Sequence, residues 1–175
     1  MQNADQTVKA SSFTELYGKH ARAVYQFAYY LSGDPALAED IVSETFLRVW
    51  DSSVTVRMET VRGYLFTIAR NLFMHDLRKK SKQDPLEDHH AAAGNTARDV
   101  EFKEDLRATP AALQTLPETD RAALLLRAQQ GVSYEEIARI LGLSLSSVKV
   151  KIHRARLFLA ERRERVIHAN TSSSH

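Results

Sequence analysis

The chain has 175 residues, no cysteine and a formal net charge of +2. Disulfide bonds and thiolate metal ligands are therefore excluded, and no apolar run approaches the roughly 20 residues that a membrane-spanning helix needs. The polar start MQNADQTVK is unlike a secretory signal. We expect a soluble, cytoplasmic protein with one or two small domains, without membrane insertion.

The charge is distributed unevenly along the chain. Residues 62–82 hold six Lys or Arg against one Asp, and residues 140–165 hold seven against two acids. Between these two basic blocks, residues 83–105 carry seven acids against two basic residues. This alternation predicts two nucleic-acid-contacting surfaces separated by an acidic stretch.

Two helices are predicted between Phe13 and Trp50. Apolar residues recur at helical spacing from Phe13 to Leu31. Asp34 followed by Pro35 predicts a cap and the first turn of a second helix, which runs to Trp50. This second helix combines acidic with large apolar residues, which suits a protein partner or, alternatively, a core helix with a solvated acidic side. We expect Trp50 to pack inside.

A polar loop at 51–60 precedes a third predicted helix, at 62–80. The helix has an apolar stripe on one side and polar side chains on the other. Cations together with an aromatic ring and an amide suit contact with the DNA backbone and stacking on exposed bases. The alternative is an ordinary amphipathic helix with a basic end. The candidate DNA-contacting residues are Tyr64, Thr67, Arg70, Asn71, Arg78, Lys79 and Lys80.

Residues 83–105 are polar and acidic, and we predict a flexible linker there. His89 and His90 lie in this segment beside acidic residues, but a linker gives no rigid frame for a coordination sphere. No metal site is therefore expected. No cofactor and no catalytic activity are expected either, because the sequence offers neither a nucleophile with a base nor a phosphate-binding glycine loop. Thr109-Pro110 and Leu116-Pro117 predict the starts of two further helices.

A helix-turn-helix is predicted from Ser133 to Arg156. Ser133 caps its first helix, Gly142 ends that helix in the left-handed conformation, and Ser144 caps the second helix. Apolar residues including Val148 supply the shared core. Such a motif binds DNA through its second helix.

Helical phasing places Leu145, Val148, Ile152, Ala155 and Leu159 on the inner side of the second helix. On the outer side, Val150 suits a thymine methyl group and Arg154 suits a guanine edge, although a solvated basic face is the alternative. Leu157 and Phe158 are expected to point partly outward. The candidate DNA-reading residues are Ser146, Ser147, Lys149, Val150, Lys151, His153 and Arg154.

With these motifs in order, the chain resembles bacterial RNA polymerase sigma factors of the extracytoplasmic-function (ECF) type. The likeness rests on AEDIVSETFLRVW at 38–50, RGYLFTIARNLFMHDLRKK at 62–80, and the segment 116–156 with its helix-turn-helix. It implies an all-α fold with two small helical domains, at 12–82 and 106–165, joined by a flexible acidic linker at 83–105. Residues 166–175 are expected to form a disordered tail.

The resemblance also implies a role for each segment. Asp40, Glu44 and Leu47 would contact the clamp helices of the polymerase β′ subunit. The helix 62–80 would recognise and melt the −10 element, and the helix-turn-helix would read the −35 element of the promoter. Core RNA polymerase (including its β flap), promoter DNA and an anti-sigma factor are the implied partners.

Three other classes are compatible with parts of this pattern. A helix-turn-helix repressor or activator would bind duplex DNA alone as a dimer, yet no dimerisation helix is evident. A sigma-like mimic that titrates an anti-sigma factor would lack DNA-reading cations, which this chain has. A nucleic-acid enzyme would need a catalytic constellation, and none is found.

Overall fold

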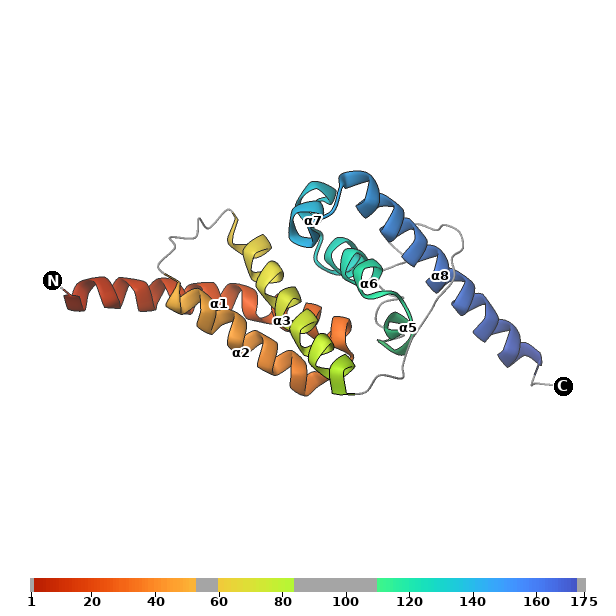
Figure 1. Cartoon of the computed structure of the whole chain (residues 1–175), viewed down its shortest axis with the longest axis horizontal. Coiled ribbons are helices and arrows are strands. Elements are labelled where there is room, and N and C mark those ends of the chain that lie inside the picture. The colour runs from red at the N-terminus through yellow and green to blue at the C-terminus, as the bar shows by residue number, and fades with distance from the viewer. Residues whose placement is uncertain (1, 53–59, 84–109, 173–175) are drawn as a thin grey trace. The chain divides into compact units, whose positions relative to one another are not determined.

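The computed structural model describes residues 2–52, 60–83 and 110–172. The chain divides into two compact units, Met1–Lys80 and Ser81–His175. Every regular element in the described ranges is a helix, as Figure 1 shows, which confirms the predicted all-α class. None of the described helices is both long and apolar enough to cross a membrane.

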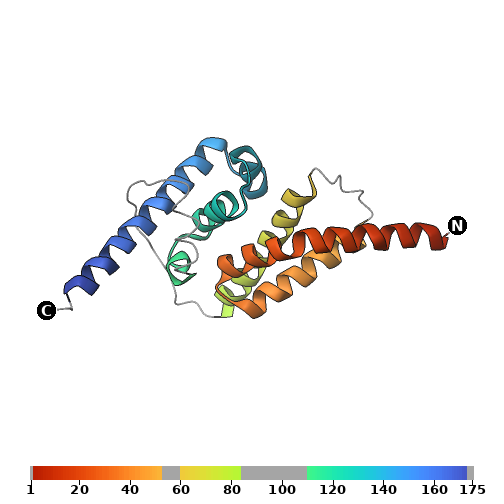
Figure 2. The same ribbon diagram turned by 180° about the vertical axis from the view of Figure 1, so that it is seen from behind.

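In its described residues, the first unit contains the helices α1 (Gln2–Ser32), α2 (Pro35–Asp51) and α3 (Val61–Gln83). Helices α1 and α2 form a hairpin and lie side by side in both Figure 1 and Figure 2. The Asp34 carboxylate accepts hydrogen bonds from the N–H groups of Ala36 and Leu37, at 3.0 and 3.2 Å. The predicted cap is therefore confirmed, and Pro35 occupies the first turn of α2.

The core of the first unit forms where α3 meets the hairpin. The rings of Phe27 on α1 and Phe66 on α3 meet edge to face, with centroids 5.2 Å apart. Leu65 and Ala69 of α3 are buried, as the predicted apolar stripe requires, while Leu72 is half-buried. The α3 side chains on the opposite side of the helix are thereby left towards solvent.

The second unit contains α5 (Pro110–Gln114), α6 (Glu118–Leu124), the π-helical turn η1 (Leu125–Gln129), α7 (Tyr134–Leu141) and α8 (Leu145–Ser172). Helices α5 and α6 begin where the two proline motifs predict. The buried Arg121 links them, since its guanidinium donates to Gln114 Oε1 at 2.7 Å and to the carbonyl of Leu116 at 3.1 Å. Burial lowers the pKa of Arg121 from its ordinary value.

Helix α8 is longer than the sequence predicts. It continues to Ser172, so the expectation of a disordered tail beginning at residue 166 is wrong for the residues that the structure describes. Within this extension, His168 Nδ1 donates to the carbonyl of Glu164, one turn earlier, at 2.9 Å. Within its unit, the end of α8 projects past α5 (Figure 1).

Candidate nucleic-acid interface

The turn between α7 and α8 has the geometry of a helix-turn-helix. Ser133 Oγ accepts a hydrogen bond from the N–H of Glu136 at 3.2 Å, and so caps α7. Gly142 ends α7 with φ +65°, the left-handed conformation that glycine adopts without strain. Ser144 Oγ then accepts from the N–H of Ser147 at 3.2 Å and caps α8. Only residues 142–144 separate the two helices, as predicted.

The inner side of α8 packs against α6 and α7. Val148, Ile152 and Ala155 are almost completely buried, which confirms most of the predicted phasing. Leu145 is an exception with 37% of its surface exposed, because it is the first residue of α8 and precedes the packed turns. Leu159 is half-buried.

The prediction that Leu157 points outward is wrong. Leu157 is only 7% exposed, whereas Phe158 is half-buried. Helical phase places Leu157 about 180° from the buried Val148, so its burial does not follow from the packing of the inner side of α8. With 7% of its surface exposed, Leu157 is not an exposed contact for a partner.

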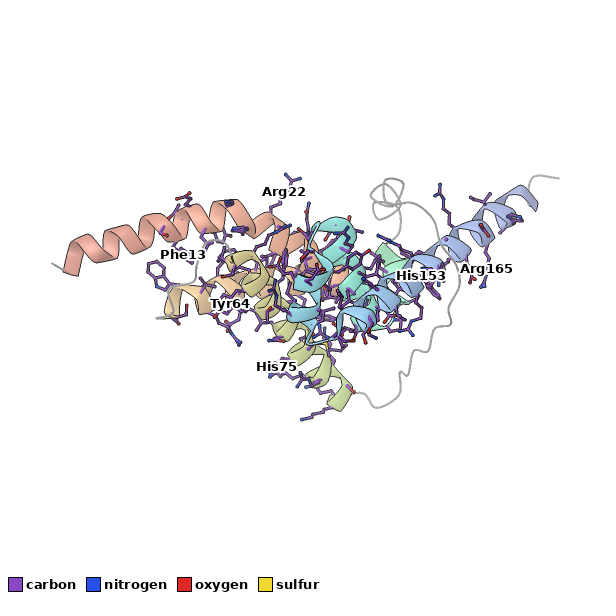
Figure 3. All side chains as sticks on the ribbon, turned by 90° about the horizontal axis from the view of Figure 1, so that it is seen from above. Phe13, Arg22, Tyr64, His75, His153 and Arg165 are labelled. Atoms are coloured by element: carbon purple, nitrogen blue, oxygen red, sulfur yellow. The ribbon has the colours of Figure 1, made fainter. Side chains whose placement is uncertain are left out.

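The outer side of α8 presents the exposed side chains Ser146, Lys149, Val150 and His153. Their spacing of three and four residues places them along one helical face. Val150 is 59% exposed, which is unusual for an aliphatic side chain and suits contact with an apolar group such as a thymine methyl. Figure 3 labels His153 on this helix. Ser147 is half-buried.

Arg154 and Lys151 are held by a carboxylate of the same unit. Asp120 of α6 is 1% exposed and accepts from Arg154 Nε at 2.7 Å and from Arg154 Nη2 at 2.9 Å. Lys151 Nζ lies 3.2 Å from the same carboxylate. The hydrogen bonds from Arg154 and the negative charge of Asp120 raise the pKa of Arg154 above its ordinary value. That Arg154 reads a guanine stays a prediction, but its guanidinium already has this partner.

Sequence reasoning missed Asp120. The residue lies 34 positions before Arg154, so no helical period connects the two residues. The available signal was that Asp120 and Arg121 are followed directly by the five apolar residues AALLL, which indicates a buried helix. A buried carboxylate requires a charged or hydrogen-bonding partner nearby.

The second candidate surface lies on α3. Tyr64, Asn71, Arg78, Lys79 and Lys80 are exposed, whereas Thr67 and Arg70 are half-buried. Figure 3 labels Tyr64 on this helix. Thr67 Oγ1 donates to the carbonyl of Gly63 at 2.8 Å, and Lys80 Nζ lies 2.9 Å from Asp76. The structure thus gathers all seven predicted residues on one helix, with five of them exposed.

The outer face of α2 carries the three predicted polymerase contacts. Asp40 and Leu47 are exposed, and Leu47 has 56% of its surface accessible. Glu44 is half-buried and accepts from Arg48 Nε at 2.8 Å. The opposite face of α2 is buried in the core through Ile41 and Phe46, among others.

Two sequence-level predictions fall partly or wholly outside the described residues. They are the loop 51–60, of which 53–59 are not described, and the linker with His89 and His90. Among the residues that the structure describes, no three His, Asp or Glu side chains come together as a metal site.

The matching family models correspond to the two units. The model for sigma-70 region 2 matches residues 16–83, and the model for sigma-70, region 4 matches residues 106–159.

Similar proteins agree with these matches. The ECF RNA polymerase sigma factor SigE of Mycolicibacterium smegmatis is 38% identical over 151 residues, which cover 83% of this chain and 59% of SigE. The ECF RNA polymerase sigma factor EcfG of Rhodopseudomonas palustris is 36% identical over 138 residues, or 74% of this chain and 73% of EcfG. The solved sigma factor RpoE from Bartonella quintana, in complex with the anti-sigma factor NepR, superimposes with a TM-score of 0.68 at 28% identity. That match covers 86% of this chain and 95% of RpoE.

Two helical units that match sigma-70 regions 2 and 4 in this order, the second with a helix-turn-helix, define a protein of the sigma-70 class. Within that class, the chain belongs to the ECF family of RNA polymerase sigma factors.

Proposed function

We propose that this protein binds core RNA polymerase and directs it to promoters that carry a −35 and a −10 element. The observation that supports this proposal is the difference in exposed side chains among three helix faces. Helices α3 and α8 present polar and cationic side chains, and α2 presents an acidic and apolar face. The polymerase would perform the chemistry, and this chain would select the start site in the cytoplasm.

The −35 element would be read by α8 in the major groove. A helix-turn-helix places its second helix there, with its first turns against the base edges. The exposed side chains Ser146, Lys149, Val150 and His153 occupy these turns. Val150 would contact a thymine methyl group, while Lys149 would bind a phosphate.

The −10 element would be recognised and opened by α3. Extruding a base from the stack costs a few kcal/mol, which stacking and hydrogen bonding in a fitted pocket offset. Tyr64 offers an exposed ring and Asn71 an exposed amide on α3. The exposed run Arg78, Lys79 and Lys80 would contact phosphates at the end of the helix.

The polymerase would be bound through α2. Asp40, Glu44 and Leu47 are spaced four and three residues apart and therefore share one helical face. A large exposed aliphatic side chain surrounded by acidic groups is typical of a protein interface and unsuited to DNA. We propose the β′ clamp helices as the partner of this face, with the β flap as a further contact of the second unit.

An anti-sigma factor would regulate the protein. The solved relative RpoE is in complex with the anti-sigma factor NepR, and the solved relative CnrH is in complex with the cytosolic domain of CnrY. A mimic that only titrates an anti-sigma factor would have no use for the cations on α3 and α8, and so the initiating function is favoured.

Run-off transcription with core RNA polymerase and a genomic promoter library tests the proposal. We expect transcripts that start downstream of one shared bipartite motif. Val150→Ala should change the upstream half of the selected motif, and Asn71→Ala the downstream half. The absence of any chain-dependent transcript would contradict the proposal.

The polymerase interface is tested separately by Leu47→Asp. We expect this variant to lose core binding in a pull-down, because it places a charge in an apolar contact. Ile167→Asp is the matched control, since Ile167 is 54% exposed on α8, close to the 56% of Leu47. Equal binding by both variants would contradict the assignment of α2.

A further inference from the structure

Asp120 of α6 is joined by hydrogen bonds to α8, the helix proposed to face the DNA. Its carboxylate is almost completely buried, yet all three hydrogen bonds that it accepts come from Lys151 and Arg154, two partly exposed cations of α8. The side chains of Arg154 and Lys151 are 43% and 24% exposed. One buried group therefore controls two cations at the border of the candidate interface.

The geometry of this contact fixes the rotation of α8 about its own axis. Arg154 donates through two parallel N–H groups, a bidentate pairing with strong directional preference. Lys151 lies three residues earlier on the same side of α8 and binds the same oxygen, Oδ1, as Arg154 Nη2. A rotation of α8 about its axis would move Arg154 and Lys151 away from Asp120 and break this contact. It would also change which side chains face outward, because successive residues are about 100° apart around a helix.

The contact also determines how much charge is available to DNA. One carboxylate compensates part of the charge of two cations. A cation that already binds a buried carboxylate gains little binding free energy when it exchanges that carboxylate for a DNA phosphate. Lys149, two positions before Lys151, is exposed on the outer face and is not held by Asp120. The two lysines thus belong to different electrostatic environments on the same helix.

We propose that Asp120 is a positioning residue for promoter reading. Through Arg154 and Lys151 it fixes the rotation of α8 about its axis, and it compensates part of their charge, so that these two cations contribute little to phosphate binding. Sequence is then read by Ser146, Val150 and His153, while Lys149 binds a phosphate. This inference rests on the proposed sigma function and adds to it the residue that sets which face of α8 meets the bases.

The lysine pair gives the first test, with polymerase holoenzyme formed from the full-length chain. Promoter binding is measured over a series of salt concentrations for Lys149→Gln and Lys151→Gln. Loss of one phosphate contact lowers the slope of log K against log salt by about 0.9 in magnitude. We expect this decrease for Lys149→Gln and less than half of it for Lys151→Gln. Equal decreases in both variants would overturn the proposal.

Asp120→Asn gives the second test, with Glu161→Gln as a control that makes the same change of charge on α8. We expect Asp120→Asn to reduce the ratio of promoter to non-promoter binding by roughly tenfold, the effect of losing one base contact. Binding to non-promoter DNA should be retained or increased, because two cations are released. Glu161→Gln should leave the ratio unchanged.

A purely structural role for Asp120 predicts a different result, in which promoter and non-promoter binding fall together. That result, or an unchanged ratio in a folded variant, would overturn the proposal. If circular dichroism shows that Asp120→Asn does not fold, the comparison of Lys149→Gln with Lys151→Gln still tests the proposal. Failure of the wild-type holoenzyme to select any promoter would contradict the sigma function itself, together with this inference.

Discussion

Phe13 of α1 meets Trp50 of α2 edge to face, with ring centroids 5.0 Å apart and ring planes at 74°. Phe13 also contacts Phe46, at 6.2 Å between centroids. These rings join the two helices next to the proposed polymerase-binding face. Trp50 is the single tryptophan of the chain, so its fluorescence reports on the first unit alone. The expectation that Trp50 packs inside is met in part, since the residue is half-buried.

Phe13→Ala should destabilise the first unit and shift the emission of Trp50 to longer wavelength. We expect a loss of about 2 kcal/mol, roughly half of that for a fully buried phenylalanine, because Phe13 is half-buried. Urea unfolding followed by Trp50 fluorescence measures both effects. Tyr25→Ala, at a ring stacked on Tyr29, is the control and should leave the folded-state emission unchanged. An unshifted emission in Phe13→Ala would contradict the ring contact.

Thr45→Val should stabilise the first unit. Thr45 is fully buried, and its hydroxyl oxygen has no hydrogen-bond partner among the described residues. Since an unpaired buried hydroxyl costs about 1–3 kcal/mol, its replacement by a methyl group should add about 1 kcal/mol. The melting temperature seen by Trp50 fluorescence should rise by about 4–8 °C. Thr67→Val, which removes a hydroxyl that is bonded to Gly63, should give no such increase.

Gly142→Ala should destabilise the helix-turn-helix through the backbone alone. A Cβ at Gly142 meets no atom within 4 Å, but φ is +65°. The left-handed conformation costs an L-residue about 1–2 kcal/mol, so we expect a loss of this size. Gly18→Ala lies inside α1 with equally open space and should instead add about 0.5–1 kcal/mol. Denaturation followed by circular dichroism measures both variants, and a loss in both would contradict the backbone explanation.

The stability of the first unit should decrease below about pH 6.5 because of His20. Burial, and then the positive charges of Lys19 and Arg62, lower the pKa of His20 from its ordinary value of 6.5. The unfolded chain therefore binds a proton more readily than the folded one. The stabilising contribution of neutral His20 is present above pH 6.5 and is lost as the pH falls towards the lowered value.

Trp50 fluorescence melts at about pH 7.5 and about pH 5.5, on either side of the ordinary histidine value, measure this effect. The difference in melting temperature between the two conditions should be smaller in His20→Gln than in the wild type. An identical pH dependence in both proteins would show that His20 does not contribute.

Features encoded within one or two turns were predictable from the sequence. The caps at Asp34 and Ser133 and the left-handed glycine at 142 depend on residues within three or four positions of each other. Their hydrogen bonds therefore follow from local sequence. The exposed face of α8 follows in the same way from helical periodicity.

Features that depend on contacts between distant segments were not predictable. The Asp120–Arg154 pair joins residues 34 positions apart and appears only once α6 packs on α8. Leu157 is only 7% exposed, although its helical phase, about 180° from Val148, places it on the outer side of α8. The extension of α8 to Ser172 runs through polar residues that sequence composition assigns to a tail.

The most direct test of the sigma function is binding of a promoter fragment by the chain alone, by core RNA polymerase alone and by both together, with permanganate reactivity of thymines at the −10 element. The account predicts a specific complex with reactive thymines only when both proteins are present. Specific binding of duplex DNA by the chain alone, unchanged by the polymerase, would contradict it and indicate a helix-turn-helix regulator instead.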